Sequence, residues 1–164
     1  MVDVKKNAEL PNALAFDIIE RMFFGYRDFV GVADAALAAT GYGRAHHRVL
    51  HFVDRNPGLT VGELLTILKV TKQGLSRTLK TLVDDGMIVA EPGRSDRREK
   101  CLATTEAGHR LAVSLAALQT DRIDRALSRL PDDGRDVVAQ FLAGLVDADE
   151  REAVLRRIDG TRAP

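Results

Sequence analysis

The chain is poor in the residues on which several protein classes depend. One cysteine among 164 residues excludes an internal disulfide framework and fits a reducing compartment. Tryptophan is absent and aromatic residues make up only 5% of the chain, which leaves little for an aromatic cage or a base-stacking surface. No apolar run suits a signal peptide or a membrane span. We therefore expect a cytoplasmic protein that forms one domain or one intertwined subunit.

Catalytic motifs are missing as well. The sequence holds no G-x-S-x-G, no P-loop and no H-E-x-x-H. The adjacent carboxylates of Asp84 and Asp85 stand beside Gly86 at the end of a predicted helix, where we expect them to be solvated. These absences argue against the common enzyme classes, and we expect neither enzymatic activity nor a cofactor.

Histidine and cysteine make a weak case for a metal site. His47 and His51 are four residues apart and would share one face of a helix. Zinc, however, takes three or four protein ligands, and no second tight cluster follows. His109 and Cys101 are isolated in the sequence. We expect no bound metal, and we interpret Cys101 as a small apolar residue rather than a redox sensor.

Charge is balanced over the whole chain but not along it. Residues 44–110 carry 12 basic and 8 acidic side chains, a net charge of +4, whereas residues 1–43 and 111–164 each carry −2. Binding to a nucleic acid needs local rather than global positive charge. The zero net charge of the chain therefore leaves a DNA partner open.

The residues from Thr60 to Leu102 predict two short helices followed by a β-hairpin. Thr60 and Glu63 have the spacing of a capping box at the start of the first helix. Thr71 is a good N-cap for a second helix that runs to about Gly86. Helical spacing directs one set of apolar residues of this second helix inward: Leu75, Leu79, Leu82 and Val83.

The opposite face of the second helix is polar. Its side chains can hydrogen-bond base edges or phosphates, and arginine matches guanine bidentately. Gly74 costs helix stability but allows a close approach of the backbone to a partner. An ordinary solvated face remains the alternative. The candidate DNA contacts on this helix are Lys72, Gln73, Ser76, Arg77 and Lys80.

The hairpin that follows has a basic tip. Strands are predicted over Met87–Glu91 and Glu99–Ala103, on either side of a Pro-Gly turn signal. At the tip, Asp96 can pair with Arg98 and stiffen the loop, whereas Arg94 and Arg97 suit the narrow, electronegative minor groove of DNA. The order of helix, turn, helix and hairpin is typical of a winged helix-turn-helix.

The runs KQGLSRTLKTLVDDG (72–86) and SDRREKCLATTEAG (95–108) resemble the multiple antibiotic resistance regulator (MarR) family. The resemblance implies a mainly α fold with a small β-hairpin wing, in which N- and C-terminal dimerisation helices flank the winged helix-turn-helix core. It also implies a homodimeric repressor that a small ligand releases from DNA. The wing pair of that family maps onto Asp96 and Arg98, and its recognition-helix arginine onto Arg77.

The flanking segments predict helices with wide apolar stripes. We expect residues 1–43 to hold an N-terminal dimerisation helix, residues 44–110 the DNA-binding region, and residues 111–164 the C-terminal dimerisation helices. One long helix is predicted from Pro11 to about Thr40, another from about Thr105 to Leu130, and a third that opens at Pro131. Two interlocked subunits would set their recognition helices about one DNA turn apart, roughly 34–36 Å.

A ligand pocket between the first, second and long fifth helices would suit a small aromatic or phenolic acid. The histidines there could instead hydrogen-bond an opposing helix or make binding sensitive to pH. A rival hypothesis is a winged helix used only for protein contacts. The candidate ligand residues are Tyr26, Val30, Tyr42, His46, His47, Arg48 and His51.

Overall fold

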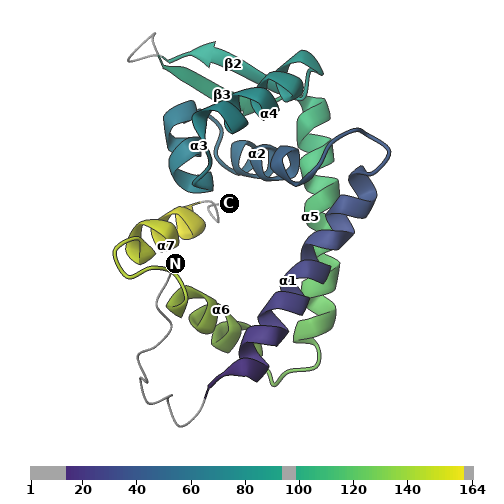
Figure 1. Ribbon diagram of the computed structural model, residues 1–164, viewed down its shortest axis with the longest axis vertical. Helices are drawn as coiled ribbons and strands as arrows, with labels where there is room; N and C mark the ends of the chain where they lie inside the picture. The colour runs from purple at the N-terminus through teal and green to yellow at the C-terminus, as the bar shows by residue number, and fades with distance from the viewer. Residues whose placement is uncertain (1–13, 94–98, 161–164) are drawn as a thin grey trace, which may run out of the picture.

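The computed structural model describes residues 14–93 and 99–160. Most of these residues are helical, and a small antiparallel sheet lies at one end of the molecule (Figure 1). None of the described helices is both long and apolar enough to cross a membrane. The elements in chain order are α1 (Phe16–Leu37), α2 (Arg44–Arg55), β1 (Leu59–Thr60), α3 (Val61–Leu68), α4 (Lys72–Asp84), β2 (Ile88–Pro92), β3 (Lys100–Thr104), α5 (Glu106–Leu127), α6 (Gly134–Gly144) and α7 (Arg151–Gly160).

Two long helices carry the small domain at one end. Figure 1 shows α1 and α5 side by side, with α2, α3, α4 and the sheet gathered at the upper end of α5. From the other end of α5 the chain turns back through α6 to α7, which brings the C-terminal helix toward α2 and α3. The molecule therefore has a winged-helix region, from α2 to the first turns of α5, and a region of terminal helices.

The sheet has three strands in the order β1-β3-β2, all antiparallel. The predicted hairpin is confirmed, although each strand begins one residue later than expected, at Ile88 and at Lys100. The two-residue strand β1 was not predicted. It forms because Leu59 pairs with Leu102 and Thr60 pairs with Cys101 on the central strand.

Threonine side chains begin the helices of the winged-helix region. The Thr60 hydroxyl accepts a hydrogen bond from the Glu63 amide (3.2 Å), and the Glu63 carboxylate accepts one from the Thr60 amide (2.8 Å), which confirms the capping box. The Thr71 hydroxyl accepts from the Gly74 amide at 3.1 Å, as its predicted N-cap role requires. These caps satisfy amide groups that the first turn of a helix otherwise leaves unpaired.

Thr105 caps α5 and also attaches it to the connection between α4 and β2. Its hydroxyl accepts from the Gly108 amide at 3.1 Å and donates to the Gly86 carbonyl at 2.7 Å. At Gly108 the helix touches the backbone of Met87, just before β2, because a Cβ placed there would lie 2.0 Å from the carbonyl oxygen of Met87. The T-x-x-G sequence at the start of α5 is therefore a packing requirement.

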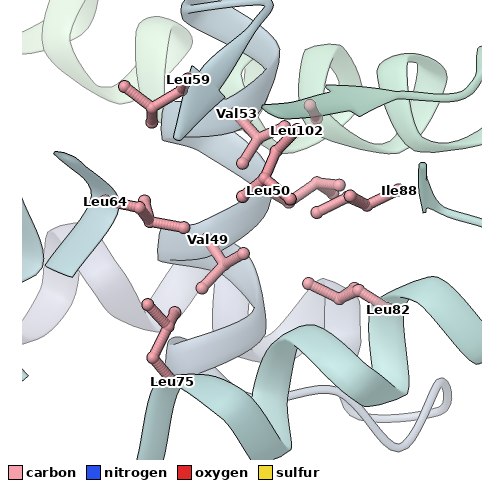
Figure 2. Close-up of a cluster of buried hydrophobic side chains, with 10 residues drawn as sticks. Val49, Leu50, Val53, Leu59, Leu64, Leu75, Leu82, Ile88 and Leu102 are labelled. Atoms are coloured by element: carbon pink, nitrogen blue, oxygen red, sulfur yellow. The ribbon is translucent and has the colours of Figure 1, made fainter. Parts of the chain in front are cut away.

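The main hydrophobic core lies inside the winged-helix region. Figure 2 shows its side chains converging from α2, α3, α4, β2 and β3. A smaller buried cluster of Ala33, Leu37 and Leu115 joins α1 to α5. Burying such side chains contributes about 1.5–3 kcal/mol each, which accounts for a stably packed domain. The main core consists of Val49, Leu50, Val53, Leu59, Leu64, Leu75, Leu82, Ile88, Leu102 and Ala112.

The terminal helices, in contrast, leave large apolar side chains in solvent. Many of these side chains are uncovered within the described chain, with Phe23 64% and Leu142 54% exposed. Exposed apolar residues of this size rarely gather on a monomer surface without a binding role. They lie mainly on the first half of α1, on α5 and on α6: Phe16, Ile18, Ile19, Met22, Phe23, Phe24, Tyr26, Val113, Leu118, Ile123, Val137, Phe141 and Leu142.

The sixth helix begins later than the sequence indicates. Pro131 was expected to open it, but α6 starts at Gly134. The Gly134 amide donates to the Pro131 carbonyl at 2.8 Å, so residues 131–133 form a turn instead. The first helical bond runs from Val137 to the carbonyl of Asp133. Asp133 is therefore the N-cap residue of α6, and Pro131 and Asp132 belong to the turn before it.

Candidate nucleic-acid interface

One face of α4 is polar and open to solvent, as the sequence predicts. Leu75, Thr78 and Leu82 are buried against the winged-helix core, which turns the opposite face outward. Val83, predicted to face inward, is 37% exposed because it lies at the edge of that buried stripe. The outward side chains are the five candidate DNA contacts, Lys72, Gln73, Ser76, Arg77 and Lys80.

The charges on this face differ in how they are paired. The ammonium group of Lys80 forms an ion pair with Asp84, one turn along the same helix. Lys72 and Arg77 form no ion pair with the residues that the structure describes. Gly74 is helical, and its amide donates the cap hydrogen bond to the Thr71 hydroxyl, so the backbone of the first turn is regular there. Lys72 and Arg77 are therefore the cations that an anionic partner can reach most directly.

A short turn sets the direction of α4 relative to α3. Lys69 ends α3 in the left-handed conformation, with a φ of 49°, and its amide donates to the Leu65 carbonyl. This conformation is uncommon for a residue with a side chain, and it reverses the chain within two residues. The Lys69 ammonium is 2.7 Å from a carboxylate oxygen of Glu150, just before α7. The C-terminal segment therefore touches the turn that positions α4.

The wing consists of β2 and β3, and it projects from the winged-helix region beside α4 (Figure 1). Its strands are joined up to Gly93, whose amide donates to the Glu99 carbonyl at 2.9 Å. The predicted wing contacts lie outside the described residues, so the prediction for them stays open: Arg94, Asp96, Arg97 and Arg98.

A buried carboxylate connects α2 to the wing and to α5, and the sequence analysis missed it. Asp54 on α2 accepts a hydrogen bond from the Thr104 hydroxyl (2.8 Å), and the same oxygen is 2.8 Å from Nδ1 of His109. Its side chain is only 10% exposed. The partners lie 50 and 55 residues away, and no local pattern could have paired them.

The candidate ligand residues lie along the contact between α1 and α2 and in the turn between them. A guanidinium nitrogen of Arg48 donates to the Tyr26 hydroxyl at 3.3 Å. Tyr42 stacks on His46, and its hydroxyl donates to Asp85 at 2.8 Å. Burial, helped by that hydrogen bond, raises the pKa of Tyr42 to about 12. These contacts tie the α1–α2 turn to the end of α4.

The remaining candidates differ in their surroundings. Nδ1 of His46 accepts a hydrogen bond from the Gly43 amide at 3.1 Å, and Val30 is half-buried on α1. Burial lowers the pKa of His47 and of His51, so both imidazoles favour the neutral form. His51 lines two cavities, one of about 610 Å³ against α3 and α7 and one of about 570 Å³ against α5. The other six candidates line neither.

The described part of the chain brings together no three His, Cys, Asp or Glu side chains that could hold a metal ion. Cys101 is half-buried on β3, where it pairs with Thr60 and Glu91 across the sheet. Its interpretation as a small apolar residue rather than a redox sensor stays a prediction.

Comparisons with known proteins agree with this architecture. A family model described as the MarR family matches residues 40–99. The HTH-type transcriptional regulator PetP of Rhodobacter capsulatus is 49% identical over 108 residues, which are 66% of this chain and 65% of that protein. The aligned part is therefore slightly under two thirds of the length of PetP.

Solved structures with the same fold cover most of the chain. The transcriptional repressor CouR, bound to a 23-mer DNA duplex, is 26% identical with a TM-score of 0.65, over 87% of this chain and 98% of its own. FabT of Streptococcus pneumoniae, in complex with DNA, is 16% identical with a TM-score of 0.71, over 80% and 94%. The transcriptional regulator SlyA is 20% identical with a TM-score of 0.69, over 84% and 99%. The predicted fold class is confirmed.

Proposed function

This chain belongs to the MarR family, and on that premise we propose that it is a DNA-binding transcriptional regulator. We propose further that it acts as a homodimeric repressor on a palindromic operator and that a small ligand releases it. PetP is named a transcriptional regulator, and CouR and FabT are described with bound DNA, which supports the proposal.

The outward face of α4 is the observation that carries the proposal. The core of the winged-helix region fixes this helix from behind, and Gln73, Ser76 and Arg77 point away from it. A helix presented in this way fits the major groove, where such side chains read base edges. The net charge of +4 in residues 44–110 would attract the phosphate backbone, whatever the charge of the terminal segments.

The exposed apolar surface of the terminal helices supports the homodimer. Residues such as Phe23 on α1 and Leu142 on α6 are more than half exposed, and a second copy would cover them symmetrically. Two winged-helix regions held about 34–36 Å apart would read half-sites one turn apart, in an operator of roughly 16–20 base pairs. Light scattering at micromolar concentration tests this step, and a stable lone protomer would contradict it.

The DNA proposal is tested by selecting a binding site from random duplexes and titrating it by fluorescence anisotropy. Arg77→Ala should weaken specific binding by about 1–3 kcal/mol if the guanidinium reads a base. Arg125→Ala removes the same charge from the far half of α5, where Arg125 pairs with Asp121, and is the matched control. Equal affinity of the Arg77 variant and the wild type would remove Arg77 from the interface.

Salt dependence separates DNA reading from a winged helix used for protein contacts. A DNA complex should lose affinity steeply as salt rises, because cations displace counterions from the phosphates. An apolar protein interface has no such dependence. Failure to prefer any duplex over random sequence would favour the protein-contact alternative.

Ligand release is the third step of the proposal. Tyr26, Val30, Tyr42 and Arg48 stay candidates because they lie where α1 meets α2, between the terminal helices and the winged-helix region. His46, His47 and His51 accompany them on α2. A thermal-shift screen of phenolic acids tests this step. The step fails if no compound raises the melting temperature or lowers the affinity for the selected operator.

A further inference from the structure

The helices α3, α4 and α5 begin in the same way, with a threonine hydroxyl that accepts a hydrogen bond from the amide three residues later. That third residue is Glu63 in α3, Gly74 in α4 and Gly108 in α5. Glu63 shows that a residue with a side chain fits this position, since its carboxylate completes the capping box. Glycine is less favourable than alanine inside a helix, so each of the two glycines needs a reason of its own.

The two glycines differ in what surrounds them. A Cβ at Gly108 would lie 2.0 Å from the Met87 carbonyl oxygen, so packing excludes a side chain there. A Cβ at Gly74 would meet the Thr71 hydroxyl oxygen at 3.1 Å and, outside its own helix backbone and its two chain neighbours, no other atom of the described residues within 4 Å. Glu63 carries its side chain beside the same kind of cap. Packing within the described chain therefore explains the glycine at 108 but does not require the one at 74.

The surface that Gly74 presents is apolar, although it lies on the exposed side of α4. Its amide donates to the Thr71 hydroxyl at 3.1 Å, and its carbonyl accepts from the Thr78 hydroxyl at 3.2 Å. Because both polar groups of its backbone are satisfied within the helix, the exposed part that remains is the α-carbon methylene. Arg77, three residues later, is a neighbour of this methylene on the helix surface.

We propose that Gly74 is a specificity-determining residue, at which the 5-methyl group of a thymine contacts the backbone of α4. This inference rests on the proposed function, because it needs α4 to lie in the major groove. Base edges in that groove present hydrogen-bond donors, acceptors and the thymine methyl group. A polar edge would find no free backbone partner at Gly74, whereas a methyl group packs against an α-carbon that has no Cβ. An alanine at this position would put its own methyl group in the same space.

The DNA side of the contact is tested first, with the full-length wild type. A binding site is selected from random duplexes, and each thymine of a half-site is replaced in turn by deoxyuridine, which pairs in the same way but lacks the methyl group. One of these replacements should weaken binding about fourfold in each half-site, as expected for the loss of one buried methyl group. Fluorescence anisotropy measures the affinities. A selected half-site without thymine, or equal affinity after every replacement, overturns the inference.

The protein side is tested by moving the methyl group from the DNA to the protein. Gly74→Ala should weaken binding to the selected site at least about tenfold, because two methyl groups would occupy one space. The same variant should bind the deoxyuridine site more tightly than the thymine site, which reverses the wild-type preference at that base pair. Gly62→Ala adds a methyl group to α3, where the nearest atom is 3.9 Å away, and should keep the preference for thymine. A Gly74 variant that still prefers thymine at every position contradicts the proposal.

Thermal melts separate this contact from a folding defect. Gly74→Ala should be at least as stable as the wild type, because alanine is the better helix former. A lower melting temperature would mean that the cap itself requires glycine at position 74, which removes the basis of the inference.

The selection experiment separates the contact from the proposed function. If no duplex is preferred over random sequence, the proposed function fails and the thymine contact fails with it. If a site is selected but the methyl exchange changes nothing, the proposed function stands and the role of Gly74 alone is overturned.

Discussion

The winged-helix region and the terminal helices have similar apolar patterns, but those residues are buried in the first and exposed in the second. In both, large apolar residues recur at helical spacing. Leu50 and Leu82 of the winged-helix region are at most 1% exposed, whereas Phe23 of α1 and Leu142 of α6 are more than half exposed. The first region closes its own core, and the second leaves an apolar surface that the described chain does not cover. The contrast shows that an apolar stripe on a helix predicts burial but does not predict which element or which molecule will cover it.

The largest expected effect on the free energy of unfolding follows directly from this contrast. Leu50→Ala should lower the free energy of unfolding by about 2–5 kcal/mol, because it opens a cavity in a closed core. Leu142→Ala removes the same atoms from an exposed site and should cost much less within one subunit. Urea denaturation at two protein concentrations separates the two cases.

The Leu142 variant should lose stability only at protein concentrations where self-association stabilises the fold. Its urea midpoint should therefore fall more on dilution than the wild-type midpoint does. The Leu50 variant should lose the same free energy at both concentrations. If both variants lose equal stability at high dilution, α6 is covered by its own chain and the contrast between the two regions is wrong.

A smaller effect is expected where the two regions join. Gly108→Ala should destabilise the fold by about 1–3 kcal/mol, since its Cβ would lie 2.0 Å from the Met87 carbonyl oxygen and must push α5 from the sheet. Gly62→Ala in α3 is the control, because the nearest atom to its Cβ is 3.9 Å away. That change should be neutral or stabilise by up to about 1 kcal/mol. Thermal melts followed by circular dichroism measure both.

The smallest effect concerns His51, which lies on α2 at the boundary of the two regions. Burial, together with the charges of His47 and Arg55, holds its folded pKa below the ordinary value of about 6.5. As pH falls through about 6.5, the unfolded chain takes up a proton that the folded imidazole does not, so stability is lost. His51→Gln should flatten this loss between pH 7.5 and 5. An unchanged slope in urea denaturation would mean that the boundary is hydrated.

Local patterns predicted much of what positions α4. Thr60, Thr71 and Gly86 act within a few residues of where they stand, so cap and turn chemistry were enough to place α3, α4 and the connection after them. The polar face of α4 followed from the spacing of Leu75 and Leu82. The family resemblance rested on these same residues, and it is confirmed.

Local sequence patterns could not predict the contacts between residues that are far apart in the chain. The strand β1 exists because Leu59 meets Leu102, and the Asp54 carboxylate is satisfied by Thr104 and His109, more than forty residues along the chain. The cavity under α7 depends on the path that the chain takes after α5. The residues near position 153 do not by themselves predict that path.

The order of residues thus determined the helices, their caps and the side chains on the α4 face, because hydrogen bonds between residues three or four apart decide these features. Tertiary packing decided which apolar stripes became core, which remained open for a partner, and where the cavities lie. The physical reason is that burial depends on whatever element arrives opposite, and that element comes from a distant part of the chain or from another molecule.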